Sequence, residues 1–125
     1  MPKITVAAVQ MAPAFADKLG NLRRMAHLVK EATGMGAQLI VFPELATTGY
    51  SFMSKDEALS FAEPIAPDML TFKSMRVLAE SFDCHILWGM IELDVGTGDL
   101  YNSQVYVAPD GTWVSYAKVN RLGTF

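Results

Sequence analysis

Two ionisable side chains, Glu44 and Lys118, stand near the ends of apolar runs and could do acid–base chemistry together. Glu44 follows the apolar run 39–42 and Pro43. Because proline cannot continue a central strand, the chain is expected to leave the sheet there. A carboxylate at the lip of a sheet is partly desolvated, which raises its pKa and suits it to act as a base. The alternative is a carboxylate that accepts backbone N–H bonds as a helix or loop cap, and strand ends host both kinds.

Lys118 lies near the end of the last apolar run of the chain. A lysine there usually faces solvent or protects a sheet edge from further pairing. Beside a strand-end glutamate, however, a fixed ammonium can neutralise negative charge that develops on a substrate oxygen or nitrogen. We therefore expect Glu44 and Lys118, which are far apart along the chain, to converge on one shared cavity.

Cys84 and His85 together suggest a nucleophile and its base. Adjacent residues of a strand point to opposite faces, so these two side chains should not meet, and Cys84 is expected to be a buried structural cysteine. Neither histidine is spaced from another histidine or cysteine as metal ligands are. The sequence therefore predicts no metal site.

The composition limits the class of protein. The chain has 125 residues, 51% of them hydrophobic, and a formal charge of −3. These values predict one domain over residues 1–125 and disfavour disorder or nucleic-acid binding. The sequence has no apolar run long enough to span a bilayer, and its single cysteine predicts a reducing, cytoplasmic location.

The apolar periodicity predicts a β-α-β-α-β-β-β order. The expected strands are 4–10, 38–42, 84–92, 101–108 and 112–119, and the expected helices are 17–33, 55–62 and 68–82. Asp17 and Asp68 are the expected helix caps, and Asp110-Gly111 predicts a hairpin turn. A strand–helix–strand unit makes the first two strands parallel, so the fold class is α/β with a mixed sheet. Helices on one face would leave the other apolar face to be covered by a second sheet or another subunit.

Several motifs resemble the N-terminal part of the nitrilase, or carbon–nitrogen hydrolase, superfamily. The resemblance extends from Ile4 to about Leu122. The matching pieces are Val6-Ala7-Ala8-Val9-Gln10, Asn21, Gly36 to Leu45 with Thr48-Gly49-Tyr50, Tyr101-Asn102-Ser103, Pro109-Asp110-Gly111, and Tyr116 with Lys118. The Pro-Glu-Leu block followed by Thr-Gly-Tyr is the most specific of them.

This resemblance implies an α-β-β-α sandwich that hydrolyses nonpeptide C–N bonds with a Glu–Lys–Cys triad and no cofactor. By motif, Glu44 corresponds to the general base, Lys118 to the oxyanion-stabilising lysine and Tyr50 to a residue that lines the substrate pocket. The substrate would be a small amide, nitrile or carbamoyl compound, and a homo-oligomer is expected. The family nucleophile follows a strand beyond the lysine, whereas this sequence stops at Phe125. We therefore expect half of the fold, truncated at the C-terminus and in need of a complementing C-terminal half.

Two other functions remain open. The chain could be a catalytically inactive half-fold whose apolar sheet face binds a partner as an assembly module. It could also be an α/β ligand-binding protein, although no glycine pattern supports a phosphate site at a helix N-terminus.

Overall fold

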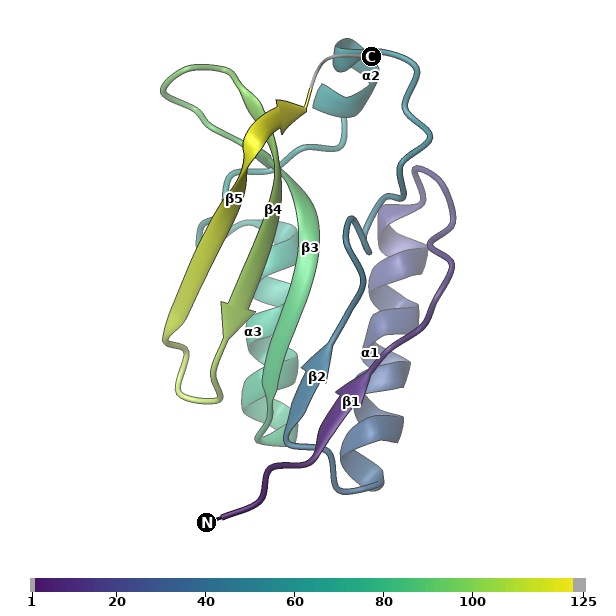
Figure 1. Ribbon diagram of the computed structural model, residues 1–125, viewed down its shortest axis with the longest axis vertical. Helices are drawn as coiled ribbons and strands as arrows, with labels where there is room; N and C mark the ends of the chain where they lie inside the picture. The colour runs from purple at the N-terminus through teal and green to yellow at the C-terminus, as the bar shows by residue number, and fades with distance from the viewer. Residues whose placement is uncertain (1, 123–125) are drawn as a thin grey trace.

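The computed structural model describes residues 2–122, with side chains described as far as Lys118. Its elements in chain order are β1 (Val6–Ala8), α1 (Lys18–Gly34), β2 (Leu39–Val41), α2 (Lys55–Leu59), α3 (Leu70–Phe82), β3 (His85–Leu93), β4 (Leu100–Val107) and β5 (Trp113–Leu122) (Figure 1). The predicted order of elements is confirmed, with α2 as a short helix before α3. The first two strands are shorter than the apolar runs that contain them.

The five strands form one sheet in the order β1-β2-β3-β4-β5. β1, β2 and β3 are parallel, with Val6 opposite Leu39 and Leu39 opposite His85. β3, β4 and β5 are antiparallel, and the turn at Asp110 and Gly111 joins the last two strands as predicted. The prediction of a mixed α/β sheet with a parallel βαβ unit is therefore confirmed.

Helix α1 begins as the sequence predicts. The Asp17 carboxylate accepts a hydrogen bond from Gly20 N at 3.1 Å, which caps the first turn. Leu22, Met25 and Val29 form its buried face and pack into the main core. One stripe of apolar side chains is thus enough to fix this helix on the sheet.

Helix α3 begins two residues later than predicted, and the prediction that Asp68 caps it is wrong. The backbone turns at Ala66–Met69, where Met69 N donates to Ala66 O, so Asp68 lies in the turn before the helix. Glu63 takes the capping role instead. Its carboxylate accepts hydrogen bonds from Thr71 N, at 3.0 Å, and from Thr71 Oγ1. Lys18 Nζ lies 2.9 Å from the same carboxylate, which ties the start of α1 to the start of α3.

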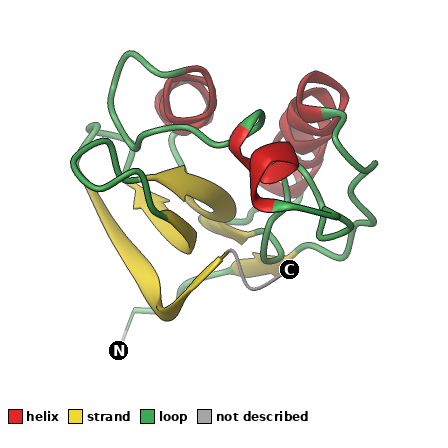
Figure 2. Cartoon of the chain, turned by 90° about the horizontal axis from the view of Figure 1, so that it is seen from above, coloured by secondary structure: helices red, strands yellow, loops and turns green. Residues whose placement is uncertain are grey.

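Both long helices cover the same face of the sheet (Figure 2). The core between them and the sheet is built around Trp88, whose ring packs against Phe72 of α3 at 6.1 Å between centroids. Phe72 also contacts Trp113, the first residue of β5. Because side chains alternate along a strand, Val114 and Tyr116 point to the opposite face, and both are exposed. The predicted one-sided covering is confirmed, and we call the other side the open face.

Candidate active site

Glu44 stands where β2 gives way to a turn over residues 44–48. The turn lies against β3, where Ala46 N donates to Gly89 O at 3.1 Å and Gly89 is close to the backbone of Glu44 and Leu45. Leu45, buried beside Glu44, has a φ of 47°, a left-handed conformation that a leucine seldom adopts. Strained backbone of this kind is common at functional sites, since the surrounding fold must hold it in place. The turn therefore fixes the direction in which Glu44 leaves the sheet.

Three side chains contact the Glu44 carboxylate, one from the same loop and two from the distant strands β4 and β5. Lys118 Nζ forms an ion pair with Oε1, and Asn102 Nδ2 donates to the same oxygen. Tyr50 Oη donates to Oε2 at 2.7 Å. The structure thus brings together all three residues that the sequence selected, Glu44, Tyr50 and Lys118, and adds Asn102 to them.

The pKa of Glu44 is lowered, whereas the sequence led us to expect a raised value. The hydrogen bond from Lys118 is the largest cause, followed by the hydrogen bond from Tyr50. Partial burial acts in the raising direction but is outweighed by these contacts, together with the positive charge of Lys118 and the bond from Asn102. The expectation from desolvation alone was wrong because it left out the donors that surround the carboxylate. Glu44 is therefore ionised at neutral pH.

The phenol of Tyr50 responds in the opposite direction. Partial burial, the hydrogen bond to Glu44 and the negative charge of Glu44 together raise the pKa of Tyr50 above its usual range. The phenol stays protonated at neutral pH, so it acts as a hydrogen-bond donor to Glu44.

Lys118 extends from β5 on the open face, on the same side of the strand as Val114 and Tyr116. Its side chain is 52% exposed and that of Glu44 is 28% exposed. Within the described part of the chain, the pair is therefore open to solvent and is not enclosed in the cavity that we expected. Lys118 also lies on an edge strand, as the alternative interpretation supposed, yet it is held by a carboxylate.

Cys84 and His85 do not meet, as predicted. Cys84 is fully buried in the main core between the helices and the sheet. Burial, and then the negative charge of Asp83, raises the pKa of the Cys84 thiol to about 11. His85 points to the open face, where its Nδ1 lies 2.5 Å from Tyr106 Oη and the two rings stack. Cys84 is a structural residue, and it lies on the helix side of the sheet, away from Glu44.

Sequence reasoning missed two residues that shape the site. Asn102 appears above only within the motif Tyr101-Asn102-Ser103, and no local pattern signals its contact with Glu44, 58 residues away. Gly89 has no role in the sequence analysis above. A glycine inside a long apolar strand is the sequence signal for a close approach of other backbone, and here the Glu44 turn is what approaches.

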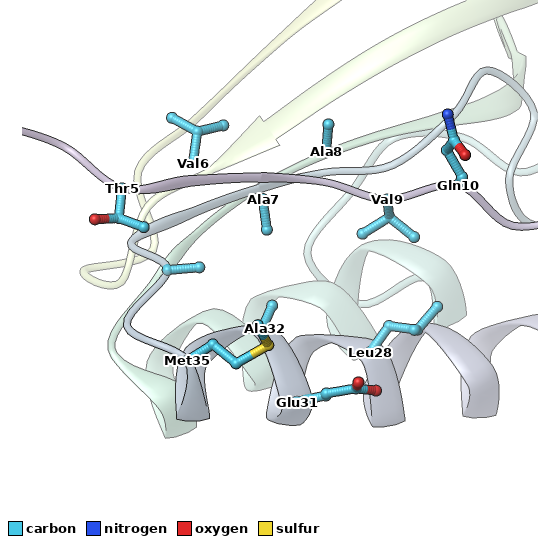
Figure 3. Close-up of a pocket in the computed structure, with 11 residues that line it drawn as sticks. Thr5, Val6, Ala7, Ala8, Val9, Gln10, Leu28, Glu31, Ala32 and Met35 are labelled. Atoms are coloured by element: carbon cyan, nitrogen blue, oxygen red, sulfur yellow. The ribbon is translucent and has the colours of Figure 1, made fainter.

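A groove of about 420 Å³ lies elsewhere, between β1 and α1 (Figure 3). Ala7 of β1, and Val9 just after the strand, point toward Leu28 and Ala32 of α1. The groove is at the far edge of the sheet from β5, and neither Glu44 nor any of the three side chains that contact it lines the groove. Among residues 2–122, no group of three or more His, Cys, Asp or Glu side chains is arranged to hold a metal ion. In the same part of the chain, no helix has the length and apolar character needed to cross a membrane.

Comparisons with known proteins give a consistent result. Residues 5–123 match the family model described as carbon–nitrogen hydrolase. The chain is 38% identical over 118 residues to a nitrilase of Pyrococcus abyssi, covering 94% of this chain and 44% of that protein. It is 32% identical over 114 residues to omega-amidase NIT3 of Saccharomyces cerevisiae, covering 87% of this chain and 38% of that protein.

Solved structures agree with the sequence comparisons. The crystal structure of Saccharomyces cerevisiae Nit3, a member of branch 10 of the nitrilase superfamily, superposes with a TM-score of 0.81 at 28% identity. That match covers 94% of this chain and 44% of the Nit3 chain. A crystal structure of an N-terminal amidase superposes with a TM-score of 0.80 at 27% identity, over 92% of this chain and 28% of that one. The chain spans less than half the length of the relatives that it matches.

Proposed function

This chain belongs to the carbon–nitrogen hydrolase family, and on that premise we propose that it carries two of the three catalytic residues of a hydrolase. The substrate class is a small amide, nitrile or carbamoyl compound with a nonpeptide C–N bond. The observation that carries the proposal is the Glu44 carboxylate held by Lys118, Asn102 and Tyr50 on the open face. The relatives support it, since they are named as nitrilases and amidases.

In this proposal Glu44 is the general base. Its Oε1 is occupied by Lys118 and Asn102, whereas Oε2 accepts only the Tyr50 hydroxyl among the described residues. Oε2 is therefore the oxygen that takes the proton of an attacking cysteine thiol. Because the lowered pKa keeps Glu44 ionised, the base is ready before the substrate binds.

Lys118 stabilises the negative charge that forms next. The thiolate attacks the substrate carbon, an S–C bond forms, and the carbonyl oxygen or nitrile nitrogen becomes anionic beside the ammonium. For an amide, Glu44 returns its proton to the leaving amine as the C–N bond breaks. Water, deprotonated by the same carboxylate, then cleaves the thioester and restores the thiol. Tyr50, exposed beside Glu44, would line the pocket in which the substrate lies.

The nucleophile in this scheme comes from outside these 125 residues. Cys84 is excluded from the role because it is buried on the helix side of the sheet with a raised pKa. The open face instead needs a covering layer, and the relatives are more than twice as long as this chain. We propose that the rest of such a fold, or a complementing half, covers the open face and brings the cysteine to Glu44.

The test compares the 125-residue chain with a longer form that includes a second half of the fold, using a panel of amides, nitriles and carbamoyl compounds. We expect turnover only by the longer form. A Glu44→Gln change should reduce it on the order of 10²- to 10⁴-fold. Cys84→Ala is the matched control and should leave the rate unchanged. Hydrolysis by the short chain that survives Cys84→Ala, or full activity of the Glu44→Gln form, would overturn the proposal.

A second function, an assembly module without catalysis, is favoured by the exposed Val114 and Tyr116 on the open face. The two proposals differ in what the ion pair does. In an assembly module, Glu44→Gln and Lys118→Met leave partner binding unchanged and no substrate analogue binds. Loss of hydrolysis with retained assembly in the same variants supports the enzyme.

A further inference from the structure

Asn102 is a buried amide next to an exposed carboxylate. It lies in β4, only 7% exposed, and its Nδ2 donates to Glu44 Oε1. Because a carboxylate can only accept, the nitrogen of the amide must face Glu44 and the oxygen must face away. That oxygen, Oδ1, is buried and has no hydrogen-bond partner among the described side chains and backbone.

The strand pairing explains how Asn102 comes to lie beside Lys118. Tyr101 pairs with Arg121 and Ser103 pairs with Ala117, so residues 118–120 of β5 stand opposite the single residue Asn102. Such a bulge bends the strand and redirects its side chains. Here it brings Asn102 of β4 and Lys118 of β5 to the same oxygen of Glu44.

Packing alone does not account for an amide at this position. A buried acceptor without a partner is unfavourable, and an apolar side chain of similar size would fill the space without that penalty. The donor end of Asn102 is the part that has a partner. The choice of residue is therefore explained by the hydrogen bond to Glu44.

We propose that Asn102 is a positioning residue that fixes the orientation of the Glu44 carboxylate, with Oε1 turned to Lys118 and Oε2 turned to Tyr50. The effect of Asn102 on catalysis rests on the proposed function, since Oε2 is the oxygen assigned to accept the thiol proton. The effect of Asn102 on the orientation of Glu44 concerns the 125-residue chain alone and can be tested without turnover.

The first measurement uses the unmodified chain. The side-chain amide of Asn102 and the carboxyl carbon of Glu44 are followed by NMR as the pH is lowered. A hydrogen bond between them predicts that the Asn102 amide signals move with the same midpoint as Glu44. Amide signals that stay constant through the Glu44 titration would overturn the inference.

The second measurement uses two variants that separate hydrogen bonding from shape. Asn102→Asp keeps the shape but replaces the donor with a negative charge, whereas Asn102→Leu keeps the branched skeleton but replaces the planar amide with an apolar group that cannot donate. Both should raise the pKa of Glu44, and Asp should raise it more because like charges oppose ionisation. A merely structural role predicts that Leu disturbs the site more than Asp, and that order contradicts the inference. Tyr106→Phe, four residues along the same strand, is the matched control: it removes a hydroxyl that lies against His85 and should leave the pKa of Glu44 unchanged.

Turnover separates this inference from the proposed function. In a catalytically active longer form, Asn102→Leu should lower kcat on the order of 10²-fold with little change in KM, since misorientation of a base affects the chemical step. Suppose that the Asn102 amide signals move with the Glu44 titration but none of the longer forms hydrolyses a C–N bond. The proposed function then fails and the positioning role stands. If hydrolysis occurs and Asn102→Leu has the wild-type kcat, the positioning role fails and the proposed function stands.

Discussion

Gly89 of β3 lies directly against the backbone of Glu44. A Cβ atom at Gly89 would sit 2.8 Å from Glu44 Cα and 2.6 Å from Leu45 N. These atoms belong to the main chain and cannot rotate aside, so the bare backbone of Gly89 is what allows the Glu44 turn to rest on the sheet. The position of the carboxylate therefore depends on a residue that never touches it with a side chain.

A Gly89→Ala change should therefore destabilise the fold by about 1–3 kcal/mol, the usual range for overpacking. It should also shift the NMR signals of Glu44 and Asn102 as the turn moves away from β3. Urea denaturation measures the first effect. Gly34→Ala is the control, because nothing lies within 4 Å of the added methyl, and we expect it to be neutral or stabilising by about 0.5–1 kcal/mol. Equal stabilities for the two variants would contradict the close approach.

The ion pair between Lys118 and Glu44 should make stability depend on pH. Since the folded pKa of Glu44 lies below its ordinary value of 4.5, its contribution is complete above pH 4.5 and is lost as the pH falls through the folded value. Lys118→Met removes the largest cause of the lowering, so the variant should lose less stability than the wild type on acidification. The measurement is the difference in urea midpoint between neutral pH and acid.

Two variants serve as comparisons for that experiment. Tyr50→Phe removes the second largest cause of the lowered Glu44 pKa. It should reduce the stability lost on acidification by a smaller amount than Lys118→Met does. Lys55→Met, at the exposed start of α2, should have no effect on it. An acid loss in Lys118→Met as large as that of the wild type would show that Glu44 is not held by the ammonium.

Cys84 should resist thiol reagents in the folded chain. At about pH 8 a thiol with the ordinary pKa of 9.0 is roughly 10% ionised, whereas one with a pKa of about 11 is roughly 0.1% ionised. Ionisation alone predicts labelling about 100-fold slower than in the unfolded chain, and burial slows it further. The labelling rate is measured with an aromatic disulfide reagent, from the absorbance of the thiolate that it releases. Protein unfolded in guanidinium is the control. Rapid labelling of the native chain would place Cys84 at the surface.

The ion pair between Lys18 and Glu63, whose side chains are 16% and 7% exposed, should matter for stability. Lys18→Met leaves the Glu63 carboxylate buried, with Thr71 as its hydrogen-bond donor. We expect the free energy of unfolding to fall by about 3 kcal/mol, the low end of the range for breaking such a pair. The double variant with Glu63→Gln removes the unpaired charge and should be more stable than Lys18→Met alone. Lys30→Met, at an exposed site on the same helix, is the control. Additive losses in the double variant would rule out coupling between the two residues.

The sequence was sufficient for features that local pattern controls. The apolar stripe of α1 and its Asp17 cap, the parallel βαβ unit and the hairpin at Asp110 all follow from spacing within a few residues. The motifs also selected Glu44, Tyr50 and Lys118, and the fold brings Lys118 of β5 to the loop that carries the other two.

Features that depend on distant partners could not be predicted in this way. Asp68 has the side chain of a helix cap, but the preceding turn displaces it, and Glu63 satisfies the helix start through contacts that no local pattern reveals. The same limitation applies to the pKa of Glu44. Its direction is decided by Lys118, Tyr50 and Asn102, and the donors of Lys118 and Asn102 become neighbours of Glu44 only when β4 and β5 join the sheet.

The uncovered valine and tyrosine of β5 have a consequence for handling the isolated chain. Contacts driven by release of water from apolar surfaces weaken on cooling. Copies of this chain that associate through Val114 and Tyr116 should therefore separate in the cold and cluster on warming. Light scattering against temperature would record that behaviour, and polar replacements at these two positions should abolish it.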